Sequence, residues 1–197
     1  MGQVLNLSCG IELVLVQTTE QKQQVKDIIE QHHSYVPSNK SVGRRIDWLI
    51  QFEDRIVGMI GIGSATYPPC KDLLSYLGIT KDEYRKIFNT IANNWRFCLV
   101  EEIRNLGTRT LKKLREIAPI EWKKKYKDNL NYLTTFVGGG RDGAVYKADN
   151  WWEIGKTAGL PTHKSSSMKW NNSMELKRLF VKPTGENRKL IFIRNMK

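Results

Sequence analysis

The chain has 197 residues, of which 40% are hydrophobic and 26% charged, and its formal net charge is +12. This length suits one domain with a real core, and no window approaches the roughly 18 uninterrupted apolar residues that a membrane helix needs. Because residues 1–16 lack the basic start of a signal peptide, we expect a cytoplasmic protein without a membrane partner.

The excess of basic residues predicts a polyanionic partner, with nucleic acid as the first candidate. A basic surface that serves only solubility is the alternative. The three cysteines, Cys9, Cys70 and Cys98, are widely spaced and form no CxxC or Cys/His metal pattern, which favours a reduced chain.

The first half of the chain predicts a strand, a helix, a hairpin and a helical insertion. The β-branched run at 11–16 indicates the strand, and apolar residues at helical spacing predict a helix that ends near 32–35. Residues 44–52 and 56–65 are typical of the two strands of a hairpin. Residues 71–91 predict an insertion of one or two short helices, with Thr80 as the cap of the second.

The second half alternates between strands and helices. Its expected elements are a strand at 93–103, a helix at 110–126, a strand at 131–137, a short helix running into a strand at 143–155, and one or two strands within 174–195. Pro119 predicts an interruption of the long helix. The order β-α-β-β-(α)-β-α-β-α-β-β predicts a single α/β domain over 1–197, with a mixed central sheet and helices on both faces.

The sequence RNLGTR, residues 104–109, connects a predicted strand to the long helix. A helix N-terminus offers unpaired N–H donors and the positive end of a dipole, which suit a phosphate group. Gly107 permits close backbone approach, and Arg104 and Arg109 add positive charge. The alternative is a basic helix start that faces solvent or DNA phosphate.

Three consecutive glycines at 138–140 precede a charged pair and a short helix. Ordering glycine costs more backbone entropy than ordering other residues, so such a run calls for a positive φ, a close approach or a ligand. Asp142 is a candidate proton acceptor or an ordinary helix N-cap. Tyr146, one helical turn further, is a candidate hydrogen-bond donor or stacking partner, or it packs against the sheet.

The segment HHSY, residues 32–35, closes the first predicted helix. A histidine at a helix end is a candidate general base or metal ligand. Adjacent helical residues point about 100° apart, so His32 and His33 cannot easily address one site together. His33 is the better candidate, and the sequence does not establish which of the two faces the site.

Arg44 and Arg45 follow Gly43 at the start of the predicted hairpin. Guanidinium groups match phosphate oxygens, so the pair suits contact with a nucleic-acid backbone. A solvated charge pair is the competing interpretation.

The element order, with a loop and a helix directly after the fourth strand, resembles the GNAT acyltransferase fold. RNLGTR is similar to the R/Q-x-x-G-x-G/A loop with which GNAT proteins hold the coenzyme A pyrophosphate, although an arginine stands at the last, small position. Residues 146–155 have the layout of an aromatic segment that follows the fifth strand in GNAT chains. The cofactor-binding residues that the resemblance implies are Arg104, Gly107, Thr108 and Arg109.

A narrower resemblance covers about residues 30–160. HHS-Y, VGRRIDWLI, NNWRF and TFV…G-x-VYKADNWWEIGKTAG look like the Mom family of phage adenine-modification proteins and the related core domain of Druantia-type defence proteins. The resemblance implies a GNAT-like transferase that converts adenine in double-stranded DNA to an N6-carbamoylmethyl form, protecting phage DNA from restriction in the bacterial host cell. It also implies acetyl-CoA or a related donor, with iron as a further candidate cofactor and His33 as its candidate ligand.

This resemblance places a set of residues in one active cleft. The catalytic candidates are His33, Ser34, Asp142 and Tyr146, and the DNA-binding candidates are Arg44, Arg45, Asn94, Arg96 and Lys147. The glycines around Asp142 would let a flipped base approach closely, since chemistry on a base requires its removal from the stack. The imidazole of the first helix and the carboxylate of Asp142 are expected to meet there.

Two rival functions stay open. An ordinary GNAT N-acyltransferase acting on an amine or a protein would explain the element order and RNLGTR, but not the net charge of +12. A non-catalytic DNA-binding module of a defence or mobile-element system would explain the charge and leave the cleft residues as packing. The sequence predicts no oligomeric state.

Overall fold

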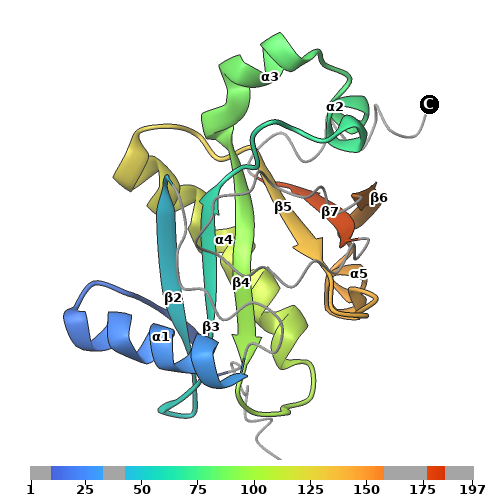
Figure 1. The fold of residues 1–197 in the computed structure, drawn as a ribbon. Helices are drawn as coiled ribbons and strands as arrows, with labels where there is room; N and C mark the ends of the chain where they lie inside the picture. The colour runs from blue at the N-terminus through green and yellow to red at the C-terminus, as the bar shows by residue number, and fades with distance from the viewer. Residues whose placement is uncertain (1–9, 33–42, 158–176, 185–197) are drawn as a thin grey trace, which may run out of the picture.

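The computed structural model describes residues 10–32, 43–157 and 177–184. In these residues a seven-stranded sheet forms the centre of the molecule (Figure 1). Its strands are β1 (Ile11–Leu15), β2 (Arg45–Phe52), β3 (Arg55–Ser64), β4 (Ile91–Leu99), β5 (Tyr132–Val137), β6 (Trp152–Thr157) and β7 (Lys177–Pro183). The helices are α1 (Thr19–His32), α2 (Lys71–Leu77), α3 (Lys81–Ile87), α4 (Leu106–Tyr126) and α5 (Ala144–Ala148), with a 3-10 turn at Phe88–Thr90.

The strands lie in the order β1-β2-β3-β4-β5-β7-β6. Neighbours are antiparallel except β4 and β5, which run parallel and are joined by the long crossover helix α4. The predicted hairpin is confirmed: Glu53 and Asp54, both with positive φ, make the turn between β2 and β3.

Helices cover both faces of the sheet because its strands alternate apolar side chains between two layers. On β2, Ile46, Trp48 and Ile50 belong to the core layer that includes α4, whereas Leu49 belongs to the layer that contacts α1. Figure 1 shows α1 crossing one face and α4 lying behind the other. The predicted mixed sheet with helices on both faces is therefore confirmed.

Helix α4 differs from its prediction in two ways. It begins at Leu106, so it includes Gly107, Thr108 and Arg109, and it continues through Pro119 without interruption. An interior proline removes one hydrogen bond and costs about 3 kcal/mol. Buried side chains lie on both sides of the proline and hold the helix to the sheet: Leu106, Leu111, Leu114, Ala118 and Trp122.

Two predicted strands also have different bounds. The strand expected at 93–103 is β4, which ends at Leu99, and the one expected from 174 is β7, which begins at Lys177. The strand expected at 188–195 lies outside the described residues. Thr80 caps α3 as predicted, since its Oγ accepts a hydrogen bond from the Glu83 N–H at 3.3 Å.

Strands β4 and β5 pair only where they begin. Their ladder joins Ile91–Asn93 to Tyr132–Thr134, and beyond it the two strands diverge (Figure 1). A β-bulge lies at the point of divergence: Arg96 and Asn94 pair with consecutive residues of β3, which leaves Trp95 as the extra residue. The middle of the sheet therefore opens between two of its own strands.

Gly107 lets α4 and α5 pack closely. A Cβ at this position would lie 2.6 Å from Cγ2 of Val145. We expect Gly107→Ala to lower the free energy of unfolding by about 1–3 kcal/mol, because the added methyl must displace a stiff β-branched side chain. Denaturant unfolding measures the loss. Val145→Ala should relieve most of it in the double variant, and an unrelieved loss would contradict this explanation.

Candidate active site

A cavity of about 560 Å³ lies where β4 and β5 diverge. Its walls come from 94–99 of β4, 135–137 of β5, the loop and helix at 140–146, and His32 at the end of α1. This volume lies within the range of small-molecule sites. Within the described residues, the opening in the sheet thus forms a pocket between β4 and α5.

A buried hydrogen-bond network forms the polar wall of this cavity. The Tyr146 hydroxyl donates to Oδ1 of Asn94 at 2.7 Å. Nδ2 of Asn94 donates to the carbonyls of Gly61 at 2.8 Å and Arg96 at 2.9 Å, which fixes the orientation of the carboxamide. Thr135 Oγ donates to the Asn94 carbonyl at 3.2 Å and lies 3.5 Å from the Tyr146 oxygen. The Tyr146 hydroxyl is therefore buried and hydrogen-bonded to Asn94.

Aromatic packing holds the ring of Tyr146 in place. It stacks on Phe180 with centroids 5.7 Å apart, and Trp151 and Phe97 contact it edge-on at 5.1 and 6.5 Å. The sequence left open whether Tyr146 packs against the sheet or acts in the site. The structure has its ring in the core and its hydroxyl in the network that lines the cavity.

An ion pair fastens the turn after α5 to α4. The buried Asp149 carboxylate accepts hydrogen bonds from Arg115 Nε and Nη2 at 3.0 and 2.6 Å, and from Trp151 Nε1 at 2.9 Å. Lys182 Nζ donates to the carbonyls of Asp149 and Asn150 at 2.9 and 2.7 Å. Since Trp151 contacts Tyr146, this cluster also fixes the position of the phenol.

Asp142 lies at the rim of the cavity and is exposed over 63% of its side chain. Its Oδ1 accepts the Ala144 N–H at 2.9 Å, and this bond holds the pKa of the carboxyl below its usual value. The N-cap of α5 is Gly143, so Asp142 is not the N-cap; it precedes the cap and binds the first N–H of the helix from there. A carboxylate with a lowered pKa is also a weaker proton acceptor.

Backbone conformation and close packing explain the glycines of this loop. Gly139, Gly140 and Gly143 have φ of 72°, 71° and 74°, which disfavour residues with a Cβ. A Cβ at Gly143 would also collide with the Phe180 ring. The run therefore shapes the loop and lets it approach the aromatic cluster around Tyr146.

The histidine cluster is described only in part. His32 ends α1, is exposed and lines the cavity. His33 and Ser34 lie outside the described residues, and so does the expected meeting of His33 with Asp142.

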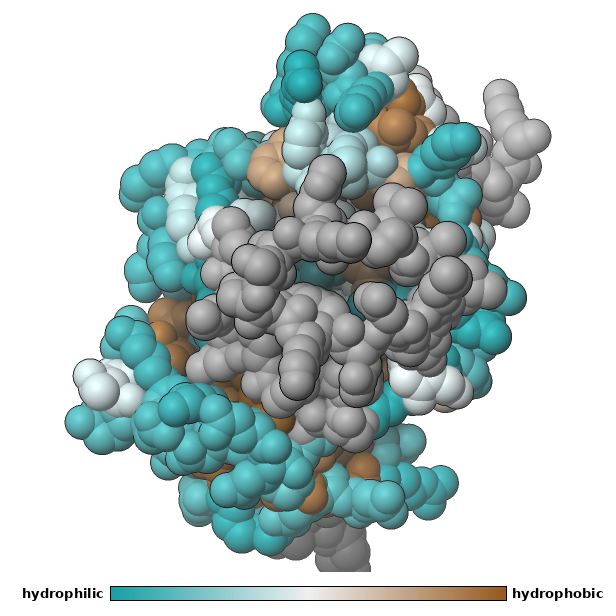
Figure 2. Space-filling view, viewed as in Figure 1, coloured by the Kyte–Doolittle hydropathy of each residue, from teal (hydrophilic) through white to brown (hydrophobic). Residues whose placement is uncertain are grey.

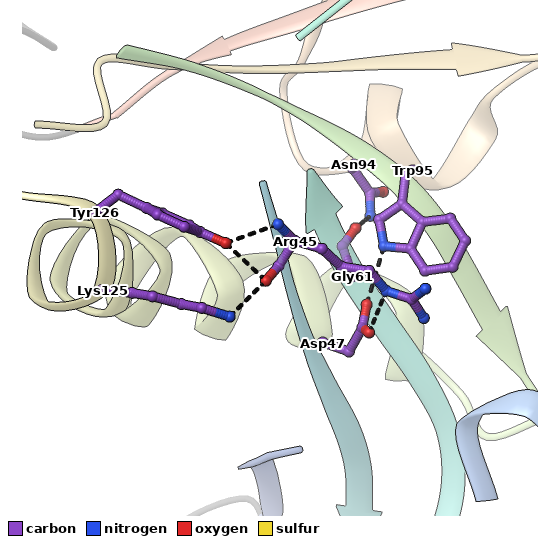
Figure 3. A network of polar contacts seen from close by, with 7 residues as sticks. All are labelled: Arg45, Asp47, Gly61, Asn94, Trp95, Lys125 and Tyr126. Carbon is purple, nitrogen blue, oxygen red and sulfur yellow. Dashed lines mark hydrogen bonds and ion pairs between the residues drawn. The ribbon is translucent and has the colours of Figure 1, made fainter. Parts of the chain in front are cut away.

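Arg44 and Arg45 make specific contacts within the protein. Nη2 of Arg44 pairs with Asp128 at 2.6 Å, and its guanidinium lies 4.7 Å from the centroid of the Tyr126 ring. Nε of Arg45 lies 2.5 Å from Asp47 Oδ2, and its guanidinium lies 4.0 Å from the centroid of the Trp95 ring (Figure 3). Both positions are therefore more ordered than the solvated pair that the sequence offered as an alternative.

Asp47 and Trp95 are site residues that the sequence interpretation missed. The Trp95 indole N–H donates to Asp47 Oδ1 at 3.0 Å across the sheet, and a side chain at Gly61 would occupy the space of this bond. Burial raises the pKa of Asp47, against the opposing effect of Arg45. The sequence signal was a lone acid in the apolar run RIDWLIQF. Thr135 was also missed, with only the polar pair in YLTTFV to indicate it.

The residues of RNLGTR lie at the start of α4, beside one end of the cavity. A Cβ at Gly107 would lie 2.6 Å from Cγ2 of Val145 and 3.8 Å from Cδ1 of Leu99, and both of these residues line the cavity. Thr108 Oγ1 donates to the Asn105 carbonyl at 3.1 Å, and the Arg109 guanidinium lies 5.5 Å from the centroid of the Phe52 ring. Arg104 is exposed. The helix N-terminus thus adjoins the cavity.

The remaining predicted positions lie on the cavity wall or at its rim. Asn94 and Arg96 line it, and Arg96 Nη1 donates to the Trp95 carbonyl at 2.7 Å. Lys147 Nζ lies 3.6 Å from Asp142 Oδ2. In the part of the chain that the structure describes, no three His, Cys, Asp or Glu side chains gather into a metal site. None of the described helices has the length and apolarity to cross a membrane.

Comparison with known proteins identifies a family and a fold. The sequence model of the family described as Druantia protein DruA matches residues 2–184. No curated protein matches the sequence.

Three solved structures are similar over most of the chain. FeeM, an N-acyl amino acid synthase from uncultured soil microbes, has 10% identity and a TM-score of 0.58, covering 98% of this chain and 100% of its own. An aminoglycoside acetyltransferase in complex with coenzyme A has 10% identity and a TM-score of 0.55, covering 94% and 100%. A GNAT-family protein from Desulfovibrio desulfuricans has 8% identity and a TM-score of 0.54, covering 89% and 99%. The predicted GNAT-like fold is confirmed.

The ion pair of Arg115 with Asp149 should be much more important for stability than an exposed pair. Its side chains are exposed over only 17% and 7%. We expect Asp149→Ala to lower the free energy of unfolding by roughly 3 kcal/mol, because it removes a carboxylate that binds a largely buried guanidinium and the Trp151 N–H. Chemical denaturation measures the change.

Glu101→Ala is the matched control, since Glu101 pairs with Arg55 through side chains exposed over 37% and 57%. Its loss should stay below about 1 kcal/mol. Equal losses in the two variants would show that the buried pair has no special role.

Proposed function

Because the chain belongs to the Druantia DruA family and has the GNAT acyltransferase fold, we propose that it transfers a group from an acyl-CoA-type donor to the exocyclic amino group of adenine in double-stranded DNA. The observation that carries this proposal is the cavity between β4 and β5, with a buried phenol held against Asn94 in its wall. The family supports a role in defence systems. The net charge of +12 supports a polyanionic acceptor over a small amine.

The cavity fits the extended arm and diphosphate of coenzyme A. Beyond Asn93 the edge of β4 faces the cavity instead of β5, so its main chain can bind the amides of an extended ligand as a neighbouring strand would. At the same end, the first turn of α4 offers N–H groups to a diphosphate, and Arg104 and Arg109 add charge. When bound, the donor supplies a thioester carbonyl that an amine can attack.

We assign Tyr146 the task of proton donor to the departing sulfur. In the acyl transfer the amino nitrogen forms a bond to the carbonyl carbon, the carbon–sulfur bond breaks, the nitrogen loses one proton and the thiolate gains one. The phenol must turn its proton from Asn94 Oδ1 to the sulfur, and the carboxamide stays fixed because its amino group is bound to two carbonyls. Burial in an aromatic cage favours this single position of the ring.

His33 remains our candidate for the proton of the attacking amine, with Ser34 beside it. Its neighbour His32 lines the cavity, which brings the end of α1 to the site. Asp142 has a different task in this proposal: its bond to Ala144 orders the loop on which Tyr146 depends. The cationic side chains Arg96 and Lys147 lie on the wall or rim, where a DNA strand entering the cavity would pass.

The Mom resemblance implies N6-carbamoylmethyladenine as the product, whereas the acyl transfer described here gives an N6-acyladenine. Extrusion of the base from the duplex would be required, since the amino group is otherwise inside the stack. A carbamoylmethyl group is joined through its methylene carbon and carries an amide nitrogen, so its transfer would need a nitrogen donor and a different bond-forming step at this site. An N-acyltransferase acting on a small amine is the rival function, for which the solved structures offer a likeness of fold.

Co-expression with a plasmid tests the proposal. Plasmid DNA is digested to nucleosides and examined by mass spectrometry for a mass-shifted deoxyadenosine, whose fragmentation separates carbamoylmethyl from acyl products. We expect modification by the unaltered chain and a loss of about 100-fold or more in Tyr146→Phe, because general acid catalysis typically contributes that much.

Tyr84→Phe is the control, because Tyr84 is a buried tyrosine whose hydroxyl donates to the Thr66 carbonyl at 3.1 Å and does not line the cavity. It should leave modification unchanged. Unmodified adenine from soluble, folded protein, together with acylation of a small amine by purified protein, would refute the DNA proposal.

A further inference from the structure

A second cavity, of about 710 Å³, opens near the start of β2. It lies between α1, the end of β1, the start of β2 and the last turns of α4. Its cationic side chains are Lys22, Arg45, Lys124 and Lys125, and its acidic ones are Asp47 and Glu121. The apolar residues Leu15, Val16, Val25 and Ile46 complete the walls. In Figure 2 hydrophobic surface is visible between hydrophilic residues of α1 and of α4. We call this cavity the basic groove.

The basic groove shares a wall with the candidate active site. Arg45 and Asp47 line the groove, whereas Trp95 lines the active-site cavity, and Asp47 binds both side chains (Figure 3). Arg96, which also lines the active-site cavity, has its guanidinium 4.9 Å from the centroid of the same indole. The side chains of Asp47 and Trp95 therefore connect the two cavities, with Arg45 lining the groove and Arg96 lining the active-site cavity.

The end of α4 makes the groove rigid. The Tyr126 hydroxyl accepts the Arg45 N–H at 2.8 Å and donates to the Arg45 carbonyl at 3.0 Å, and Lys125 Nζ donates to the same carbonyl at 2.8 Å (Figure 3). The start of β2 is thus tied to the C-terminus of α4. The proposed donor site lies at the other end of this helix, so the groove is not its continuation.

We propose that the basic groove binds the phosphodiester backbone of duplex DNA next to the base that enters the active-site cavity. The inference rests on the proposed function and assigns one part of its substrate to a specific surface. Lys22 and Lys124 supply mobile ammonium groups from two helices, and the guanidinium of Arg45 is fixed by Asp47 and Trp95. Such contacts set position on DNA without reading its sequence, and the apolar walls suit deoxyribose.

Salt-dependent DNA binding tests the groove. Fluorescence anisotropy with a labelled duplex is measured over a range of salt concentrations for the double variant Lys22→Gln/Lys124→Gln. Each lost phosphate contact should reduce the slope of log affinity against log salt by about 0.9. We therefore expect a slope lower by nearly two and binding weakened about tenfold or more at low salt.

Lys112→Gln/Lys113→Gln is the matched control, because it removes the same charge from exposed positions on the first half of α4. Lys113 and Lys124 have comparable partners, Glu116 at 4.0 Å and Glu121 at 3.8 Å. Their separation of eleven positions corresponds to about 16 Å of helix. This control should keep the unaltered slope, and an equal loss in both variants would overturn the assignment of the groove.

A third measurement separates the groove from the chemistry. Tyr146→Phe should bind DNA with unaltered affinity and slope while losing modification. DNA binding that depends on Lys22 and Lys124 without any modified adenine would refute the proposed function and leave the groove in place. Displacement of the duplex by free coenzyme A, lost in the groove variant, would instead identify the groove as a donor site and overturn the inference.

Discussion

The separation of β4 from β5 is the constraint on which the rest of the structure depends. Two parallel strands that stop pairing inside a sheet leave main-chain polar groups that must find other partners. Asn94 and Thr135 provide some of them, since the Asn94 carboxamide binds the Arg96 carbonyl and Thr135 Oγ binds the Asn94 carbonyl. The side chains that bind these main-chain groups therefore also form the polar wall of the cavity and hold Tyr146.

The two strands stay apart because each is held in place by its own neighbours. Helix α4 covers β2 and β3 with a continuous apolar face, and β7 pairs with β5 along its whole length. Arg115, Asp149 and Lys182 then connect α4, the turn after α5 and β7 by charge-assisted hydrogen bonds. Polar groups in this region thus determine the geometry of the cavity, while the apolar layers provide the stability.

Local patterns were sufficient for most elements of the fold. Alternation identified β2 and β3, the capping box at Thr80 identified α3, and the element order indicated the GNAT fold. The continuous α4 was not predictable, because the cost of Pro119 is local whereas the burial that offsets it is tertiary. For the site, RNLGTR and Tyr146 could be singled out by motif. The contact of Asp47 with Trp95 could not be predicted, because it joins β2 to β4 across β3 and requires that Gly61 has no side chain.

The place of β7 in the sheet has a consequence for how the site is assembled during synthesis. This strand comes last among the described elements, yet it lies between β5 and β6 and carries Phe180, the ring on which Tyr146 stacks. Before β7 leaves the ribosome, the chain lacks Phe180, which completes the α4 layer, stacks on Tyr146 and fills the space above Gly143. The packing around Tyr146 therefore depends on β7 and is complete only when this strand docks.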